Sequence, residues 1–266
     1  MKKAKNVNLI IGAWITGVVL LIIVVGIFYT PYDPDQMSAA DKLSGISFAH
    51  IMGCDNFGRD IFSRVMVGGW NTLLVAGGTV LIGLFFGTVI GALAGYLGGL
   101  LDELLMRLND AAFAFPSILL AMVFISLLGS GKVNVMVSLG VAFIPSFARI
   151  VRGEFMRCRS LDYVKSARLS GAGPLRIMFV HILPNTYTVL ISSIMIGFNN
   201  AVLAEAGMSY LGIGVQPPDA SLGRMLSESQ TYLFSAPWYA IGPGFMIIML
   251  VLGFSLLGEG IKKPGK

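Results

Sequence analysis

Residues 72–97, TLLVAGGTVLIGLFFGTVIGALAGYL, decide the fold of this chain, because they form a long stretch without a single charged side chain. A helix needs about 20 apolar residues to cross the hydrocarbon core of a bilayer, and this stretch exceeds that length. Glycine recurs along it at every fourth position, at Gly83, Gly87, Gly91, Gly95 and, just beyond it, Gly99. Small residues at this spacing let a second helix approach closely in lipid. We therefore expect a membrane-spanning helix that packs tightly against a neighbour.

Five other stretches are also free of charged side chains. Together with residues 72–97 they make six stretches, numbered here in chain order: residues 9–30, 72–97, 111–128, 133–148, 182–204 and 236–258. The fourth is short, and the side chain of Arg149 must extend to the interface for it to span. Pro116, Pro145 and Pro243 fall in later stretches and predict kinks. The fold class expected is an all-α membrane protein with about six transmembrane helices.

The composition agrees with this fold class. Of 266 residues, 55% are hydrophobic and 12% charged, and the mean hydropathy is +0.79. A soluble fold could not cover its surface with so few charges, so lipid must be the solvent for much of the chain. The net charge is +5. Its basic residues lie between apolar runs without interleaved aromatic side chains, which favours contact with an anionic membrane leaflet over nucleic acid.

Basic residues also predict the orientation. Of 19 Lys and Arg residues, 14 lie in the N-terminus, residues 102–110, residues 149–181 and the C-terminal tail, and 5 lie in the intervening loops. The positive-inside rule therefore predicts that both termini and the Arg-rich central loop are cytoplasmic. The stretch of residues 9–30 is longer than the apolar core of a secretory signal, so we expect it to be an uncleaved membrane anchor. Cys54 would then lie outside and Cys158 inside, which excludes a disulfide between them.

Sites for nucleotide, metal and catalysis are incomplete in the sequence. Residues 128–133, LGSGKV, lack the first glycine and the final Ser or Thr of a P-loop. His50 and His181 are too few and too far apart for a metal motif. We predict no enzymatic activity, no bound metal and no cofactor in this chain.

Polar residues within the six stretches are few. Glu205 and Glu259 lie at the ends of stretches, so none contains the buried ionisable residue that an ion-coupled carrier needs. Asn199 and Asn200 are candidates for contact with cargo, and Glu205 is grouped with them as a possible pathway residue. Such Asn residues more often bond to neighbouring helices. The chain must then use energy supplied elsewhere or act passively.

The predicted cytoplasmic loop, residues 149–184, is the most informative segment. Residues 161–169, LDYVKSARL, predict a short amphipathic helix that begins near Asp162 and stops before Gly171. A second helical piece over residues 175–183 leads to Pro184 and the fifth stretch. Long ordered connections usually have a function, and a helix that inserts into a groove of a soluble partner fits this one.

This loop resembles the one shared by the membrane subunits of binding-protein-dependent ABC importers. That loop runs Glu-Ala-Ala, three residues, Gly, nine residues and Ile-x-Leu-Pro. The positions that match it are Ala167, Gly171, Leu183 and Pro184, and those that depart from it are Lys165, Ser166 and His181.

Two more segments narrow the resemblance to the peptide/nickel branch of these importers. Residues 53–64, GCDNFGRDIFSR, are similar to G-T-D-x-x-G-R-D-x-x-S-R, and residues 208–218, MSYLGIGVQPP, to L-S-F-L-G-L-G-V-Q-P-P. The first segment also predicts an external turn from Asn56 and Gly58 alone, and the second a loop stiffened by two prolines.

The resemblance implies a type I ABC importer permease fold in a multi-pass subunit of the bacterial cytoplasmic membrane. A second homologous permease subunit, two ATPase subunits that bind ATP and an extracytoplasmic solute-binding protein are the implied partners. The residues implied to couple transport to the ATPase are Asp162, Lys165, Ser166, Ala167, Gly171, Leu183 and Pro184. The cargo would be a dipeptide, an oligopeptide or a nickel chelate.

We divide the chain into an N-terminal anchor and extracytoplasmic segment (residues 1–71), a transmembrane domain with the coupling loop (residues 72–258) and a cytoplasmic tail (residues 259–266). A channel or uncoupled carrier is the alternative function, because residues 212–218 could re-enter the membrane as a filter-like loop. A passive scaffold or receptor is a third possibility. Flux through the isolated protein would distinguish the channel from the importer.

Overall fold

The computed structural model describes the backbone of residues 2–261 and the side chains from Val7 onward, so the end of the predicted tail, residues 262–266, lies outside the described residues. The long helices are α1 (Lys2–Phe28), α2 (Ile61–Leu97), α3 (Gly99–Phe113), α4 (Ser117–Leu128), α5 (Lys132–Arg159), α8 (Tyr187–Tyr210) and α10 (Trp238–Ile261). The short ones are α6 (Asp162–Leu169), α7 (Pro174–Arg176) and α9 (Leu222–Ser229). Tighter or wider helical turns cover Ile177–Ile182, Leu183–Thr186 and Gln230–Tyr232.

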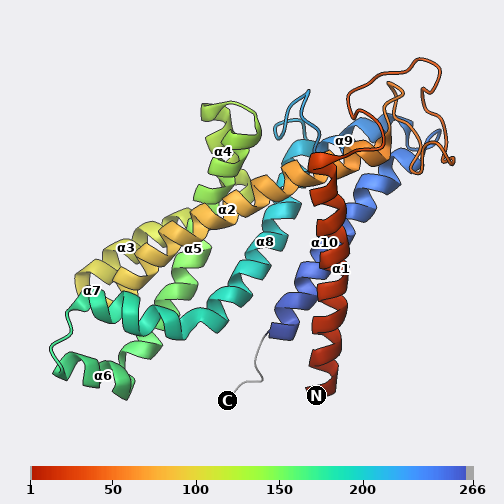
Figure 1. The fold of residues 1–266 in the computed structure, drawn as a ribbon. Helices are drawn as coiled ribbons and strands as arrows, with labels where there is room; N and C mark the ends of the chain where they lie inside the picture. The colour runs from red at the N-terminus through yellow and green to blue at the C-terminus, as the bar shows by residue number, and fades with distance from the viewer. Residues whose placement is uncertain (1, 262–266) are drawn as a thin grey trace.

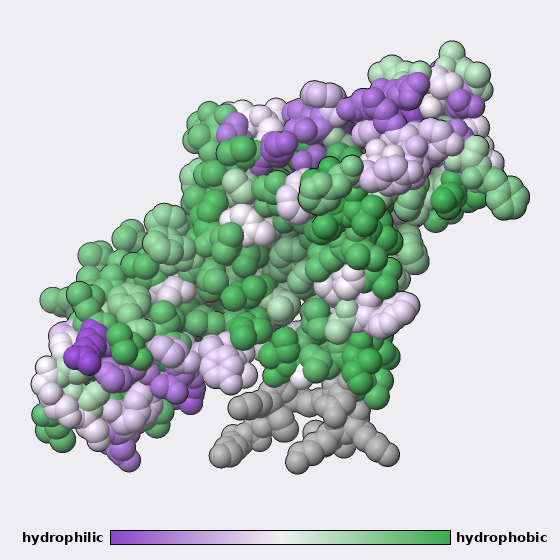
Figure 2. Space-filling model, in the orientation of Figure 1, coloured by the Kyte–Doolittle hydropathy of each residue, from purple (hydrophilic) through white to green (hydrophobic). Residues whose placement is uncertain are grey.

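The molecule has two polar ends and an apolar middle. The start of α1, the end of α10 and helix α6 lie at one end, which we call the α6 end (Figure 1). Helix α9 and residues 29–60 lie at the opposite, α9 end. Hydrophilic residues gather at both ends, and hydrophobic residues cover the region between them (Figure 2). This distribution is the one expected of helices that cross a bilayer.

Five of the described helical segments are long and apolar enough to cross a membrane, and six if one bent pair counts as a span. The bent pair corrects the predicted third stretch, residues 111–128, which is not one straight helix. Helices α3 and α4 meet there at 86°. Pro116 explains the break, because a proline disfavours helical backbone at the preceding residue, here Phe115. Pro145 and Pro243 lie inside α5 and α10 without ending them.

The fourth and fifth stretches are longer than predicted. Helix α5 continues through Arg149 to Arg159, so the predicted loop of residues 149–184 begins only after Arg159. The sequence interpretation failed because charged residues end an apolar stretch but do not end a helix. At the other side of the loop, helical structure runs from Pro174 to Tyr210 as one candidate span. The predicted boundary between residues 71 and 72 falls inside α2.

The glycine series packs α2 against α5, and these two helices share the largest interface in the described structure. A Cβ atom on Gly87 would lie 2.6 Å from the Cβ atom of Phe147 and 2.9 Å from the backbone nitrogen of Ala148. One on Gly95 would lie 2.6 Å from the carbonyl oxygen of Arg152. The close helix contact predicted from this spacing is therefore confirmed. Gly99 does not take part, because it begins α3 after the chain turns and has open space around it.

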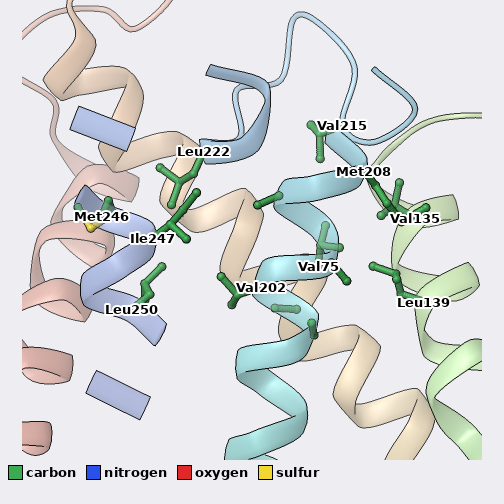
Figure 3. Packing of buried hydrophobic residues seen from close by; sticks show 14 of the residues in the cluster. Val75, Val135, Leu139, Val202, Met208, Val215, Leu222, Met246, Ile247 and Leu250 are labelled. Carbon is green, nitrogen blue, oxygen red and sulfur yellow. The ribbon is translucent and has the colours of Figure 1, made fainter. Parts of the chain in front are cut away.

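The main apolar core lies where α2, α5, α8 and α10 meet. Val202 of α8 packs near Val75 of α2, with Leu139 of α5 on one side and Ile247 of α10 on the other (Figure 3). Helix α1 packs along α10 at the edge of the bundle. A second cluster of buried residues lies at the α6 end and supports α6.

Candidate functional site

Helix α6 is attached to the bundle through one buried side chain. Val164 is fully buried, and it is the only buried residue of α6. It packs in the second cluster with Phe155 of α5 and with Ile177 and Ile182, which precede α8. Ala167 is half-buried against the same cluster, and the other side chains of α6 are exposed.

Helix α6 is terminated by a glycine, Gly171, whose backbone lies in the left-handed region. The N–H of Ala172 donates to the carbonyl of Ala167 at 3.1 Å, and the N–H of Gly171 donates to that of Arg168 at 3.1 Å. Gly171 has a φ of +82°, a region that glycine occupies without strain. These two bonds form a Schellman motif. The helix stop predicted at Gly171 is thereby confirmed.

The other predicted coupling residues lie on α6 or in the turn that precedes α8. Asp162 begins α6 and forms an exposed ion pair with Lys165 at 3.0 Å, which contributes little to stability. Ser166 is exposed and its carbonyl accepts the hydroxyl of Ser170 at 3.0 Å. Ala167 and Leu183 are half-buried and Pro184 is exposed. Leu183 and Pro184 lie in the turn that enters α8, not on α6 itself.

Large apolar side chains are exposed around α6. Leu169 is 90% exposed and Leu175 is 66% exposed. Arg168 and Arg176 stand beside them in the chain and are exposed as well. Apolar side chains framed by charge are suited to burial against another protein. The nearby Tyr163 is partly exposed, and its partial burial and its contact with Cys158 raise its pKa to about 12.

Charged pairs that the sequence interpretation missed connect α3 to α5 at this end. The guanidinium of Arg152 donates two hydrogen bonds to Asp102, at 2.6 and 2.7 Å. Arg149 donates to Asp110 at 2.7 Å. A two-bond Arg–carboxylate pair fixes orientation as well as distance. The signal in the sequence was the presence of opposite charges in two segments that both flank the same end of the bundle.

A cleft of about 330 Å³ opens between α4, α5 and α8. Its polar lining consists of Ser117, Ser146, Ser193 and Asn200, and its apolar lining of Ile118, Phe143, Phe147, Ile150, Ile196, Gly197, Leu203 and Ala204. Four uncharged polar side chains therefore face an otherwise apolar space. This surface can exchange hydrogen bonds with a ligand but provides no charge to bind one.

The structure separates the three predicted pathway residues. Asn200 is exposed and lines the cleft. Asn199 lines a smaller cavity of about 110 Å³ with Phe254 and Glu259 of α10. Its Oδ1 atom is buried without a hydrogen-bond partner among the described residues. The two neighbouring Asn side chains thus face different sides of α8.

Glu205 lies inside α8 and is fully buried, which corrects its predicted position at the end of a stretch. Its carboxylate accepts the hydroxyl of Thr72 of α2 at 2.9 Å and that of Ser209 at 2.7 Å. These hydroxyls accept in turn the backbone N–H groups of Leu222 at 3.3 Å and Val215 at 3.0 Å. Glu205 therefore holds the loop between α8 and α9 in place and does not face the cleft.

The segment of residues 53–64 is a braced turn at the α9 end. Asp55 is fully buried and accepts the Arg59 side chain at 2.6 Å and the backbone N–H of Phe57 at 2.8 Å. Arg59 also reaches Glu228 of α9 at 3.4 Å, and Tyr239 of α10 donates to the same carboxylate at 3.0 Å. The predicted turn is confirmed, and its charges connect it to two helices. Within the described residues, no group of His, Cys, Asp and Glu is arranged to hold a metal ion.

Comparison with known proteins gives consistent similarities. Residues 87–263 match the family described as "Binding-protein-dependent transport system inner membrane component". A glutathione transport system permease protein, GsiD, of Pectobacterium atrosepticum is 40% identical over 92% of this chain and 82% of its own length. A dipeptide transport system permease protein, DppC, of Haemophilus influenzae is 37% identical over 97% of this chain and 90% of its own length.

A solved structure adds evidence on the fold. A chain of the MetNI methionine ABC transporter in an inward-facing conformation has a TM-score of 0.60 with this structure. The match covers 71% of this chain and 91% of that chain at 19% sequence identity. At this identity the similarity concerns the fold alone, and it agrees with the expected importer permease fold.

Proposed function

Because this chain belongs to the family of binding-protein-dependent transport system inner membrane components, and is a membrane permease subunit of an ABC importer, we propose that its cargo is a short peptide. The observation that carries this proposal is the similarity to permeases named for dipeptide and for glutathione, at 37% and 40% identity over 97% and 92% of the chain. Both named cargoes are short peptides. A nickel chelate, the other cargo considered from the sequence, has no such support among these relatives.

We propose that the α6 end faces the cytoplasm and that both termini lie there. The excess of Lys and Arg in the segments at this end supports this orientation, because basic loops stay on the cytoplasmic side. The α9 end would then face an extracytoplasmic solute-binding protein that delivers the peptide. In this arrangement residues 1–60 supply an anchor helix and an external segment, and the transmembrane domain begins with α2 at Ile61, not at residue 72, and extends to residue 258.

The proposed role of α6 is to couple this chain to an ATPase subunit. Its exposed faces would enter a groove of the ATPase, and Leu169 and Leu175 would be buried there. Two ATPase subunits would bind ATP, and a second, homologous permease subunit would complete the pathway. The residues assigned to coupling are Asp162, Lys165, Ser166, Ala167, Gly171, Leu183 and Pro184.

Closure of the ATPase pair would move α6, and the packing around Val164 supports a route for this movement into the membrane. Val164 belongs to the same buried cluster as Phe155 of α5 and as Ile177 and Ile182 of the turns that continue into α8. Helices α5 and α8 are two walls of the cleft. A rigid displacement of α6 would therefore change the cleft and expose it to alternate sides of the membrane. The chain itself supplies no catalytic group to this cycle.

The test is peptide uptake by the reconstituted complex. The chain, its second permease subunit and the two ATPase subunits are placed in proteoliposomes with the binding protein outside. We expect uptake of a labelled dipeptide that requires ATP and the binding protein. Replacing Gly171 with Asp should reduce both co-purification of the ATPase and uptake. Uptake without the ATPase, or undiminished binding and transport by the Gly171→Asp variant, would contradict the assignment.

A further inference from the structure

We infer that the cleft between α4, α5 and α8 contacts the peptide during transport, and that its uncharged lining makes this contact independent of the charge of the peptide side chains. The inference rests on the proposed function and adds a location and a chemistry to it. Four observations support it: the position of the cleft, the chemistry of its lining, the contrast with a second groove, and the bonding of the Glu205 carboxylate in the protein interior, outside the cleft.

The cleft lies near the middle of the helices that form it. Its lining runs from Phe143 to Ile150 on α5, which spans Lys132–Arg159, and from Ser193 to Ala204 on α8, which spans Tyr187–Tyr210. The α4 wall begins at Ser117, directly after the 86° bend. A ligand in the cleft would therefore sit at the depth that a transported molecule must pass.

A second groove on the same molecule has a different lining. This groove has a volume of about 230 Å³, lies between α1, α10 and the start of α2, and is lined wholly by apolar surface. The α4–α5–α8 cleft has three hydroxyls and an amide instead, and of these the Ser193 hydroxyl donates to the carbonyl of Val189 at 2.8 Å. An amide such as that of Asn200 is costly to expose to hydrocarbon, which favours contact of this cleft with water, cargo or protein.

The lining suits a peptide of any side-chain charge. Hydroxyl and amide groups, such as those of Ser146 and Asn200, can donate to and accept from the peptide bonds that every peptide shares. Aromatic and aliphatic walls, including Phe147 and Leu203, can cover apolar side chains. No charged side chain lines the cleft. The nearest carboxylate along α8, Glu205, is bonded to Thr72 and Ser209 in the protein interior.

Asn199 and Asn200 provide a matched pair for the test, because they are neighbours on α8 with the same chemistry but face different cavities. In the full reconstituted complex, uptake of a lysine-containing and a glutamate-containing dipeptide is compared for the wild type, Asn200→Asp, Asn200→Lys and Asn199→Asp. The same binding protein serves all preparations, so a change in the ratio of the two rates arises in the permease.

We expect Asn200→Asp to raise the ratio of basic to acidic peptide uptake about a hundredfold, and Asn200→Lys to lower it similarly. Unit charges roughly 10 Å apart at an effective dielectric constant of about 20 change each of the two rates at least tenfold, and they change them in opposite directions. Asn199→Asp, which places its charge on the other side of α8 beside Glu259, should shift the ratio much less than Asn200→Asp. Ser146→Asp, on the α5 wall, repeats the test should Asn200→Asp fail to assemble.

Three results would overturn the inference but leave the proposed function standing. An unchanged ratio in both the Asn200 and Ser146 variants, with peptide uptake intact, refutes it while the proposed function stands. Equal shifts for Asn199→Asp and Asn200→Asp refute the assignment to this cleft. Loss of the second permease subunit from Asn200→Asp and Ser146→Asp complexes alike would mean that a side chain of that subunit fills the cleft. Absence of peptide uptake by the wild-type complex would instead refute the proposed function, and the inference with it.

Discussion

Gly171 has a backbone φ of +82°, and this conformation allows the two hydrogen bonds that end α6. A side chain there costs about 1–2 kcal/mol, because L-residues are strained in this region. We predict that Gly171→Ala loosens the end of α6 and reduces ATPase co-purification several-fold. Gly173→Ala is the control: Gly173 has a φ of −70° and open space around it. Equal losses from both variants would contradict the role given to this helix terminus.

Glu205 makes a prediction about stability. Its carboxylate holds the hydroxyls of Thr72 and Ser209, which hold the loop between α8 and α9. Glu205→Ala removes a buried acceptor of two hydrogen bonds, so we expect a loss of about 2 kcal/mol in the free energy of unfolding. The measurement is Tm in detergent. Glu259→Ala, at an exposed residue, should leave Tm unchanged, and a similar fall in both variants would mean that burial of the carboxylate is not the cause.

At the scale of helices, the α2–α5 interface yields a prediction with an internal control. Gly87→Ala would press a methyl group against Phe147 and the backbone of Ala148, and the backbone cannot retreat. Overpacking of this kind costs about 1–3 kcal/mol. Gly77→Ala, on the same helix with nothing within 4 Å, should be neutral or slightly stabilising. Tm of the purified subunit measures both. A Gly87→Ala variant as stable as Gly77→Ala would show that the interface adapts.

The elements also explain what the sequence can and cannot predict. The glycine spacing predicted close packing of α2 against another helix, because helix periodicity places those residues on one face, but only the structure identifies that helix as α5. The position of Pro116 predicted a break, but not its angle of 86°, which depends on how α3 packs against α5. The extension of α5 past Arg149 was missed because Asp110 and Asp102, which pair with Arg149 and Arg152, are distant in the sequence. The cleft could not be predicted either, since three separate helices form it.

At the scale of the whole molecule, the orientation in the membrane remains a prediction that one labelling experiment decides. Phe48, between α1 and α2, and Leu169, at the end of α6, are almost fully exposed and lie at opposite ends of the molecule. The native Cys54 and Cys158 are free thiols, so both are replaced to remove background labelling. Single cysteines are introduced as Phe48→Cys and Leu169→Cys in a Cys54→Ser, Cys158→Ser background.

In cells that lack the ATPase subunits, which would otherwise cover Leu169, a membrane-impermeant maleimide should label Phe48→Cys in spheroplasts and label Leu169→Cys only after the membrane is permeabilised. The physical reason is the distribution of basic residues, of which 14 of 19 lie in segments predicted to stay in the cytoplasm. The reverse pattern would move α6 to the outside, away from any cytoplasmic ATPase. The coupling role of α6 would then fail even if the chain still transported peptides, because an ATPase subunit could not reach Gly171 or Val164.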